Sequence, residues 1–146
     1  EIARLPGTHD FLDVAHHPGL EPPAPGVLLA RPEEPLFFAN AEAALRRVRT
    51  LAEQRQARVV VLSLEMSDTL DSTSIEAIGE FDAALRRRGT RLLLARVKDR
   101  LRADLARAGL DRFDAADAVP PERLFWSVDD AYARAEALLG QPSTGR

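Results

Sequence analysis

The strongest constraint on the fold is an apolar run from Val59 to Leu64 that is rich in β-branched residues. A strand with one face in water alternates apolar and polar residues, and this run almost lacks alternation. It therefore has to be covered on both faces, which places it at the centre of a sheet. The segment Arg91–Ala95 repeats the pattern and predicts a second buried strand.

Four segments with helical periodicity accompany these strands, over positions 41–52, 75–85, 101–108 and 128–138. Three of these segments are preceded by a residue that can cap a helix, namely Asn40, Asp71 and Ser127. Three are followed by a glycine that can end a helix, namely Gly89, Gly109 and Gly140. Strands that alternate with helices imply right-handed crossovers and a mainly parallel sheet. The predicted fold class is α/β, in a single domain with about four helices.

An antiparallel hairpin is predicted on the N-terminal side of this body, which makes the sheet a mixed one. Val27–Ala30 and Leu36–Phe38 are short apolar runs, and residues 31–35 between them contain two prolines. Proline favours turns, so the two runs are expected to pair across it. Weaker strand patterns lie at Phe11–Val14 and Phe113–Val119.

Residues 1–26 are interrupted by proline, because five of the ten prolines of the chain stand before Val27. Proline fixes φ and lacks an amide donor, so we expect this segment to be a linker that builds little core. The folded domain is expected over residues 27–140, and residues 141–146 are expected to be a flexible tail. The chain starts at Glu1 without Met, which suggests a cut inside a longer protein.

Composition excludes several classes of function. The 20 basic residues are spread among 23 acidic ones, for a net charge of -3, so a nucleic-acid partner is not expected. The absence of cysteine removes thiolate chemistry and disulfides. No apolar stretch approaches the roughly 20 residues of a membrane-spanning helix. The chain by itself is therefore not expected to span a bilayer.

The loop that leaves the buried strand is the first candidate site, since ligands of parallel sheets usually lie at the carboxyl ends of the strands. It ends in Asp71, Ser72, Thr73 and Ser74. In one interpretation these residues only cap a helix. In the other, amides of the first turn hold a phosphate group. The segment is acidic and contains no Lys or Arg, so a phosphate there would add repulsion unless a distant cation folds in.

Catalytic and metal sites find little support. The histidines, His9, His16 and His17, all lie in the expected linker, and a zinc site needs about four ligands. Glu65 with Asp68 or Asp71 could form an acid–base pair, but no apolar enclosure is evident to shift a pKa. There is no glycine-rich phosphate loop of the Walker type. We therefore expect no enzyme, no metal and no cofactor.

Phe37 and Phe38 are the candidate interface. On the predicted strand their side chains would face opposite sides. One ring would then enter the core, and the other would remain for a partner. Trp126 precedes the cap Ser127 and is expected to pack at the entry of the last helix.

The motif residues resemble those of a known domain. Leu62–Leu64, the helix start Asp71–Ile75, and Gly89 with Ala108–Leu110 resemble the STAS domain, which anti-sigma-factor antagonists share with sulfate-permease anion transporters. The front of the domain, with Pro25–Leu28 and Pro35–Ala41, resembles the transporter branch (SulP), in its bacterial form. One departure is visible, because the family usually has glycine where this chain has Ser74.

The resemblance implies a cytoplasmic regulatory or assembly domain that follows the membrane domain of a transporter for sulfate, bicarbonate or dicarboxylate anions. It would lie at the cytoplasmic face of the inner membrane, as part of an integral membrane protein. Implied partners are the transmembrane domain of the same permease, the permease homodimer and a cytosolic regulatory protein. Ser72 matches the serine that is phosphorylated in the antagonists. Nucleotide binding is implied by the family alone. The alternative is a free-standing phospho-switch protein that resembles the antagonists.

Overall fold

The computed structural model describes residues 1–114 and 116–141. The helices are α1 (Ala41–Gln54), α2 (Ser72–Arg87), α3 (Asp99–Arg107) and α4 (Val128–Leu139). The strands are β1 (Ile2–Arg4), β2 (Phe11–Asp13), β3 (Val27–Ala30), β4 (Val59–Ser63), β5 (Arg91–Ala95) and β6 (Leu124–Phe125). The predicted α/β class is confirmed. The expected tail at 141–146 lies outside the described residues, except for Gln141.

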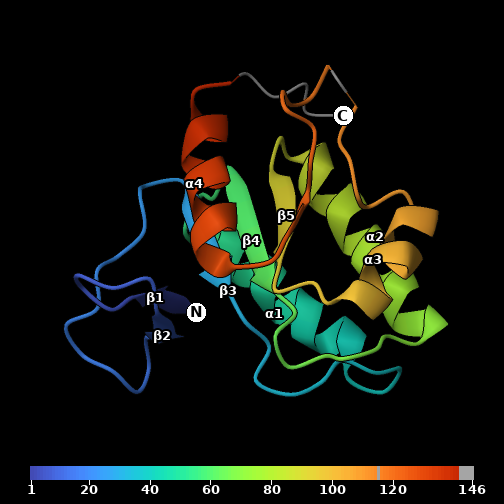
Figure 1. The fold of residues 1–146 in the computed structure, drawn as a ribbon, viewed down its shortest axis with the longest axis horizontal. Helices are drawn as coiled ribbons and strands as arrows, with labels where there is room; N and C mark the ends of the chain where they lie inside the picture. The colour runs from blue at the N-terminus through green and yellow to red at the C-terminus, as the bar shows by residue number, and fades with distance from the viewer. Residues whose placement is uncertain (115, 142–146) are drawn as a thin grey trace.

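One parallel sheet organises the domain, with strands in the order β3–β4–β5–β6 (Figure 1). Val59 at the start of β4 pairs with Val27 of β3 and with Arg91 of β5. All five residues of β4 are buried. The run without alternation therefore forms an interior strand, as predicted from its composition.

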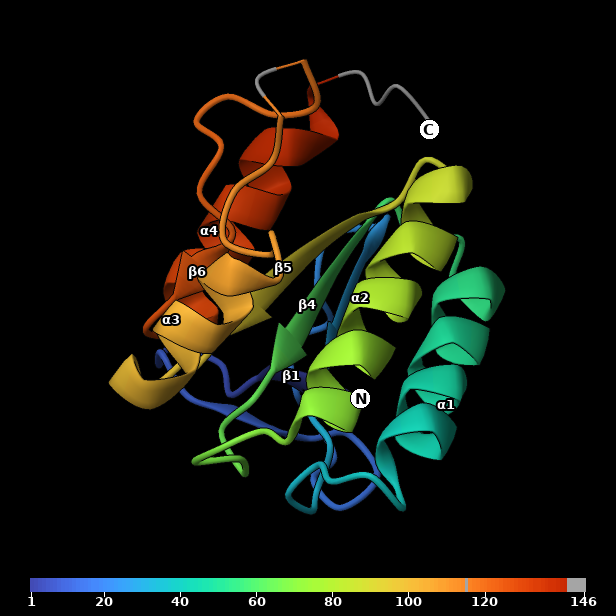
Figure 2. The ribbon, with the colours of Figure 1, turned by 90° about the vertical axis from the view of Figure 1, so that its right-hand side faces the viewer.

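Alternate residues of the strands pack into two separate hydrophobic cores, one on each face of the sheet. Leu28, Val60 and Leu92 face α1, α2 and α3, whereas Leu29 and Val61 face α4. Figure 2 shows α1 and α2 side by side on one side of the sheet and α4 on the other. Because side chains alternate between the faces of a strand, an apolar residue at every position requires helices on both faces.

Two of the three predicted helix caps are confirmed. The Asp71 side chain accepts from the amide of Ser74, and the Ser127 side chain accepts from the amide of Asp130. Asn40 stands at the N-cap position of α1 as predicted, but the predicted bond to a helix amide is wrong, because its Oδ1 accepts instead from the amide of Phe37 at 2.8 Å. Asn40 thereby closes the turn that precedes α1.

The predicted pairing of Val27–Ala30 with Leu36–Phe38 is wrong. Val27–Ala30 pairs in parallel with β4, and Leu36–Phe38 is not a strand. Side chains bind the amides of that second segment, since the Leu36 amide donates to Ser67 Oγ at 3.0 Å. Because side chains already accept from these amides, the amides do not pair with a neighbouring strand. The antiparallel pair of the N-terminal region consists of β1 and β2 instead.

The weak strand expected at Phe113–Val119 is absent among the described residues of that segment. The edge of β5 pairs instead with β6, where Leu94 is opposite Leu124. Just before β6, Arg123 is buried, and its guanidinium donates to Asp82 of α2 and to the carbonyl of Leu92. This buried pair fixes the edge strand to the sheet and to α2.

Residues 1–26 add to the core, contrary to the expectation of a bare linker. Ile2 is 1% exposed and packs in the core between the sheet and α4. Arg4 forms an ion pair with Asp129 of α4 at 2.6 Å and stacks on the ring of Tyr132. The proline-rich stretch is bound as well, because the Ala24 amide donates to the hydroxyl of Tyr132. The short edge strand expected at Phe11–Val14 is present as β2.

The substitution Ile2→Ala should lower the free energy of unfolding by about 2 kcal/mol, because it removes a fully buried side chain from a packed core. Leu5→Ala is the matched control, since Leu5 is 39% exposed. Urea unfolding of both variants and of the parent chain measures the difference. Equal stability of the two variants would mean that the front segment is not part of the folded unit.

Candidate functional site

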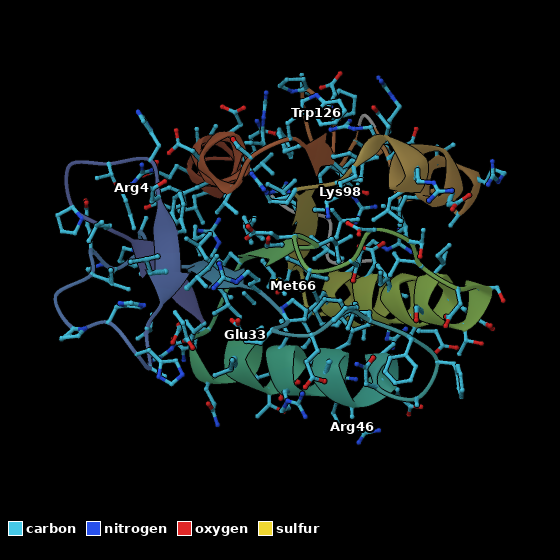
Figure 3. The ribbon with its side chains drawn as sticks, turned by 60° about the horizontal axis from the view of Figure 1, so that its bottom comes forward. Arg4, Glu33, Arg46, Met66, Lys98 and Trp126 are labelled. Atoms are coloured by element: carbon cyan, nitrogen blue, oxygen red, sulfur yellow. The ribbon has the colours of Figure 1, made fainter. Side chains whose placement is uncertain are left out.

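The loops at the carboxyl end of the parallel sheet form the candidate site. Figure 3 looks onto this end, where Glu33, Met66, Lys98 and Trp126 follow one another across the molecule. They come from the segments after β3, β4, β5 and β6, in that order. Because the strands are parallel, segments that are far apart in sequence meet at one edge.

Asp71 connects the two predicted groups of site residues. One carboxylate oxygen, Oδ1, accepts from the amide of Ser74 at 2.7 Å. The other, Oδ2, accepts from the amide of Phe38 at 2.8 Å. The Ser74 side chain and these amides favour the charged carboxylate and hold the pKa of Asp71 below its usual range. The start of α2 is thereby bound to the loop that carries Phe37.

The four residues of the predicted phosphoacceptor loop differ in exposure. Asp71, Ser72 and Thr73 are exposed, whereas Ser74 is fully buried. The Ser72 hydroxyl is therefore open to a modifying enzyme or a partner. Ser74, which stands where the family usually has glycine, turns its side chain inward and gives its amide to the cap.

Phe37 and Phe38 are both exposed, by 45% and 70%, so the expectation that one ring enters the core is wrong. Their rings meet edge to face, with centroids 5.6 Å apart. The segment is not a strand, so the two side chains are not forced to opposite sides. Leu36 fills the core position instead and is 3% exposed. The aromatic pair is thus a surface feature as a whole.

Distant cations reach the acidic loop, which its local sequence could not show. Lys98 pairs with Asp68 and holds the pKa of that carboxyl below its usual range. Arg31 and Arg96 lie 3.4 Å and 3.6 Å from the carboxylate of Glu65. The strand order could have predicted the contact of Lys98. Lys98 lies in the segment after β5, and β5 pairs with β4, whose following loop contains Asp68.

Trp126 is more exposed than expected for a packing residue, at 58%. The guanidinium of Arg102, from α3, lies 3.6 Å from the ring centroid, a cation–π contact. This contact holds α3 close to the segment between β6 and α4. Trp126 therefore has one covered face and one face in solvent.

The side chains that could act in metal or acid–base chemistry are dispersed. His9 pairs with Asp129 on α4, away from the loop after β4. Within residues 1–114 and 116–141, no three His, Asp or Glu side chains are grouped so that they could hold a metal. Glu65 and Asp68 are engaged by cations. The exposed hydroxyls and aromatic rings of this end suit contact with a partner.

Over the part of the chain that the structure describes, none of the helices combines the length and the apolar character that crossing a bilayer requires.

Replacing Asp71 by Asn should destabilise the chain at neutral pH, because the charged carboxylate binds two amides. A lowered pKa contributes stability that is present above the ordinary value of 3.8 and lost as pH falls through the folded-state pKa. The gap between parent and variant should therefore be constant above about pH 5 and shrink below pH 3.8. Urea midpoints between pH 2.5 and 7 measure it.

Glu34→Gln serves as the control for the Asp71 variant. It removes an exposed carboxylate from the same end of the domain, and Glu34 does not stand at a helix start. A gap that persists unchanged at low pH would contradict the role assigned to the Asp71 carboxylate.

The comparisons with known proteins agree on one family. The family profile for the STAS domain matches residues 22–131. Two curated proteins from Mycobacterium tuberculosis, each named a probable sulfate transporter, are 32% identical over 129 residues. The match covers 87% of this chain and 22% of their length, so the chain spans about a fifth of these relatives.

Solved structures give the same result. A sulfate transporter family protein from Wolinella succinogenes is 32% identical, with a TM-score of 0.65 over 82% of this chain and 92% of that one. A murine Solute Carrier 26 family anion transporter superposes with a TM-score of 0.76 at 19% identity, over 93% of this chain and 22% of that one. The STAS domain of a SulP transporter from Vibrio cholerae superposes at 0.62 with 21% identity, over 86% and 92%. The chain belongs to the STAS domain family and is related to the STAS domains of sulfate-permease transporters.

Proposed function

We propose that this chain is a regulatory and assembly domain of a membrane anion transporter and acts at the cytoplasmic face of the inner membrane. The observation that carries the proposal is the match along 87% of the chain to proteins named probable sulfate transporters. That match is longer than the STAS profile, which starts at residue 22.

The transported anion is proposed from the relatives alone. Their names make sulfate the first candidate. Bicarbonate and dicarboxylates remain as the other anions that the family resemblance implies. The proposed partners are the transmembrane domain of the same permease, a second permease subunit and a cytosolic regulatory protein. In this proposal residues 27–140 form the regulatory domain, and residues 1–26, which also pack against α4, lead to it from the membrane domain.

The proposed role is non-catalytic and depends on contact. Its surface consists of the exposed pair Phe37 and Phe38 and of the loop Asp71–Ser74, because one carboxylate holds both in place. The exposed end has rings and hydroxyls for a partner, and its acidic groups Glu65 and Asp68 are held by cations. The transporter role is favoured over a free-standing switch protein because the 32% identical relatives carry transporter names.

Removing residues 27–140 from a transporter that carries this chain should lower its transport rate or its level in the membrane, because the domain supports assembly and regulation. Uptake of radioactive sulfate and quantitative membrane blotting separate the two effects. A transporter with Leu5→Ala, which changes only an exposed side chain, is the control. Unaltered uptake, oligomeric state and membrane level of the truncated protein would contradict the proposed function.

The substitution Ser72→Asp should leave the fold intact and change the affinity of a partner that docks at this loop. Its charge would stand on an exposed helix start beside the Asp71 carboxylate, so it adds repulsion toward an acidic surface and attraction toward a basic one. Ser72→Ala and Thr50→Asp are the controls, since Thr50 is exposed on α1. Circular dichroism checks the fold, and affinity for the detergent-solubilised membrane domain measures binding. Equal affinity of all variants would remove Ser72 from the docking surface.

A further inference from the structure

A groove of about 590 Å³ runs between α2 and α3, on the side of the sheet away from α4. Figure 1 shows α2 and α3 next to each other on the right of the view, with α4 on the left. Its central residues are small, namely Gly79, Ala83 and Ala108. A Cβ atom added at Gly79 would meet no atom within 4 Å, so the space above this residue is open. Small residues along a groove allow the backbone of another helix to approach closely.

The rim of this groove carries unpaired negative charge. Glu76 and Glu80 line it and are exposed, and neither forms an ion pair within the described ranges 1–114 and 116–141. Asp104 lies on the opposite rim and is paired with Arg107. The rim therefore presents two carboxylates without compensating cations.

The groove reaches the candidate site at one end. Ser72 lines it, and Ser72 follows Asp71, whose carboxylate binds the amide of Phe38. An exposed aromatic pair thus lies next to the end of an open, acidic groove. Together they offer an apolar anchor and a negatively charged rim, which are complementary to an amphipathic helix with a basic face.

We propose that the groove between α2 and α3 binds a basic amphipathic helix from the cytoplasmic side of the transporter's membrane domain. The proposal rests on the proposed function for the source of that helix. Cytoplasmic loops of membrane proteins are enriched in Lys and Arg, which fits the charge of Glu76 and Glu80.

Two other occupants fit the groove less well. Anionic lipid headgroups would be repelled by the same carboxylates. A second copy of the chain docked about a two-fold axis would bring two acidic rims together. A basic helix avoids both costs and uses the open space above Gly79.

Binding is tested with the 146-residue chain and a fluorescein-labelled peptide of leucine and lysine, about 18 residues or five helical turns long. Fluorescence anisotropy gives the affinity. A peptide with glutamate in place of lysine and vesicles of phosphatidylglycerol are the comparison probes. The basic peptide should bind at least about tenfold more tightly than the acidic one, and more weakly as salt rises.

Two groove variants test the location. Glu76→Lys with Glu80→Lys reverses the charge of the rim, and Gly79→Phe fills the open space without a buried clash. Each should weaken the basic peptide by about tenfold or more, whereas Glu136→Lys on the exposed side of α4 should leave it unchanged. Thermal unfolding verifies that each variant is folded. Equal affinity of all variants, or tighter binding to the vesicles, would overturn the proposal.

Peptides of the same length that tile the cytoplasmic loops of the transporter test the occupant. A basic one should compete with the labelled peptide at the groove, and the absence of any competitor overturns the assignment to the membrane domain. Light scattering of the chain distinguishes self-association, and a dimer that Glu76→Lys and Glu80→Lys disrupt would also overturn it. Truncation of residues 27–140 tests the proposed function separately. The groove proposal and the proposed function can therefore fail independently of each other.

Discussion

The structure depends on the burial of β4 between two parallel neighbours. Its residues face two cores in turn, so both sides of the sheet must be covered and the crossovers must carry helices. This arrangement also decides where the site lies. With β3, β5 and β6 running parallel to β4, the segments that follow all four strands emerge at one edge. The exposed aromatic pair at 37–38 and an acidic loop at 65–71 meet there for that reason.

Asp71 joins two of the segments at this edge by hydrogen bonds. A single carboxylate accepts from Ser74 at the start of α2 and from Phe38 in the loop after β3. Its charge is stabilised in the folded protein, which lowers its pKa. The first turn of α2 and the loop that carries the aromatic pair are therefore bonded to the same side chain. Ser72, which follows Asp71, has its exposed hydroxyl at this junction.

Long-range contacts explain the parts of the fold that local sequence did not predict. The proline-rich front is held against α4 by two contacts. Arg4 pairs with Asp129 of α4, and the Ala24 amide donates to the hydroxyl of Tyr132 of α4. The edge strand forms at Leu124–Phe125 because Arg123 reaches Asp82, which lies 41 positions earlier. A short apolar run such as Leu36–Phe38 resembles a strand by composition, yet Ser67 and Asp71, from the loop after β4, accept from the amides of Leu36 and Phe38. None of these partners is visible within a local window of sequence.

The sequence by itself determined the buried strands, the four helices, the caps at Asp71 and Ser127, and the family, because these follow from periodicity and from residue types at fixed local spacing. Only the tertiary structure decided that the front packs on α4, that Phe37 and Phe38 both face solvent, and that cations reach the acidic loop. The physical reason is distance along the chain. Such contacts join side chains from different elements, and their geometry exists only once the sheet has brought those elements together.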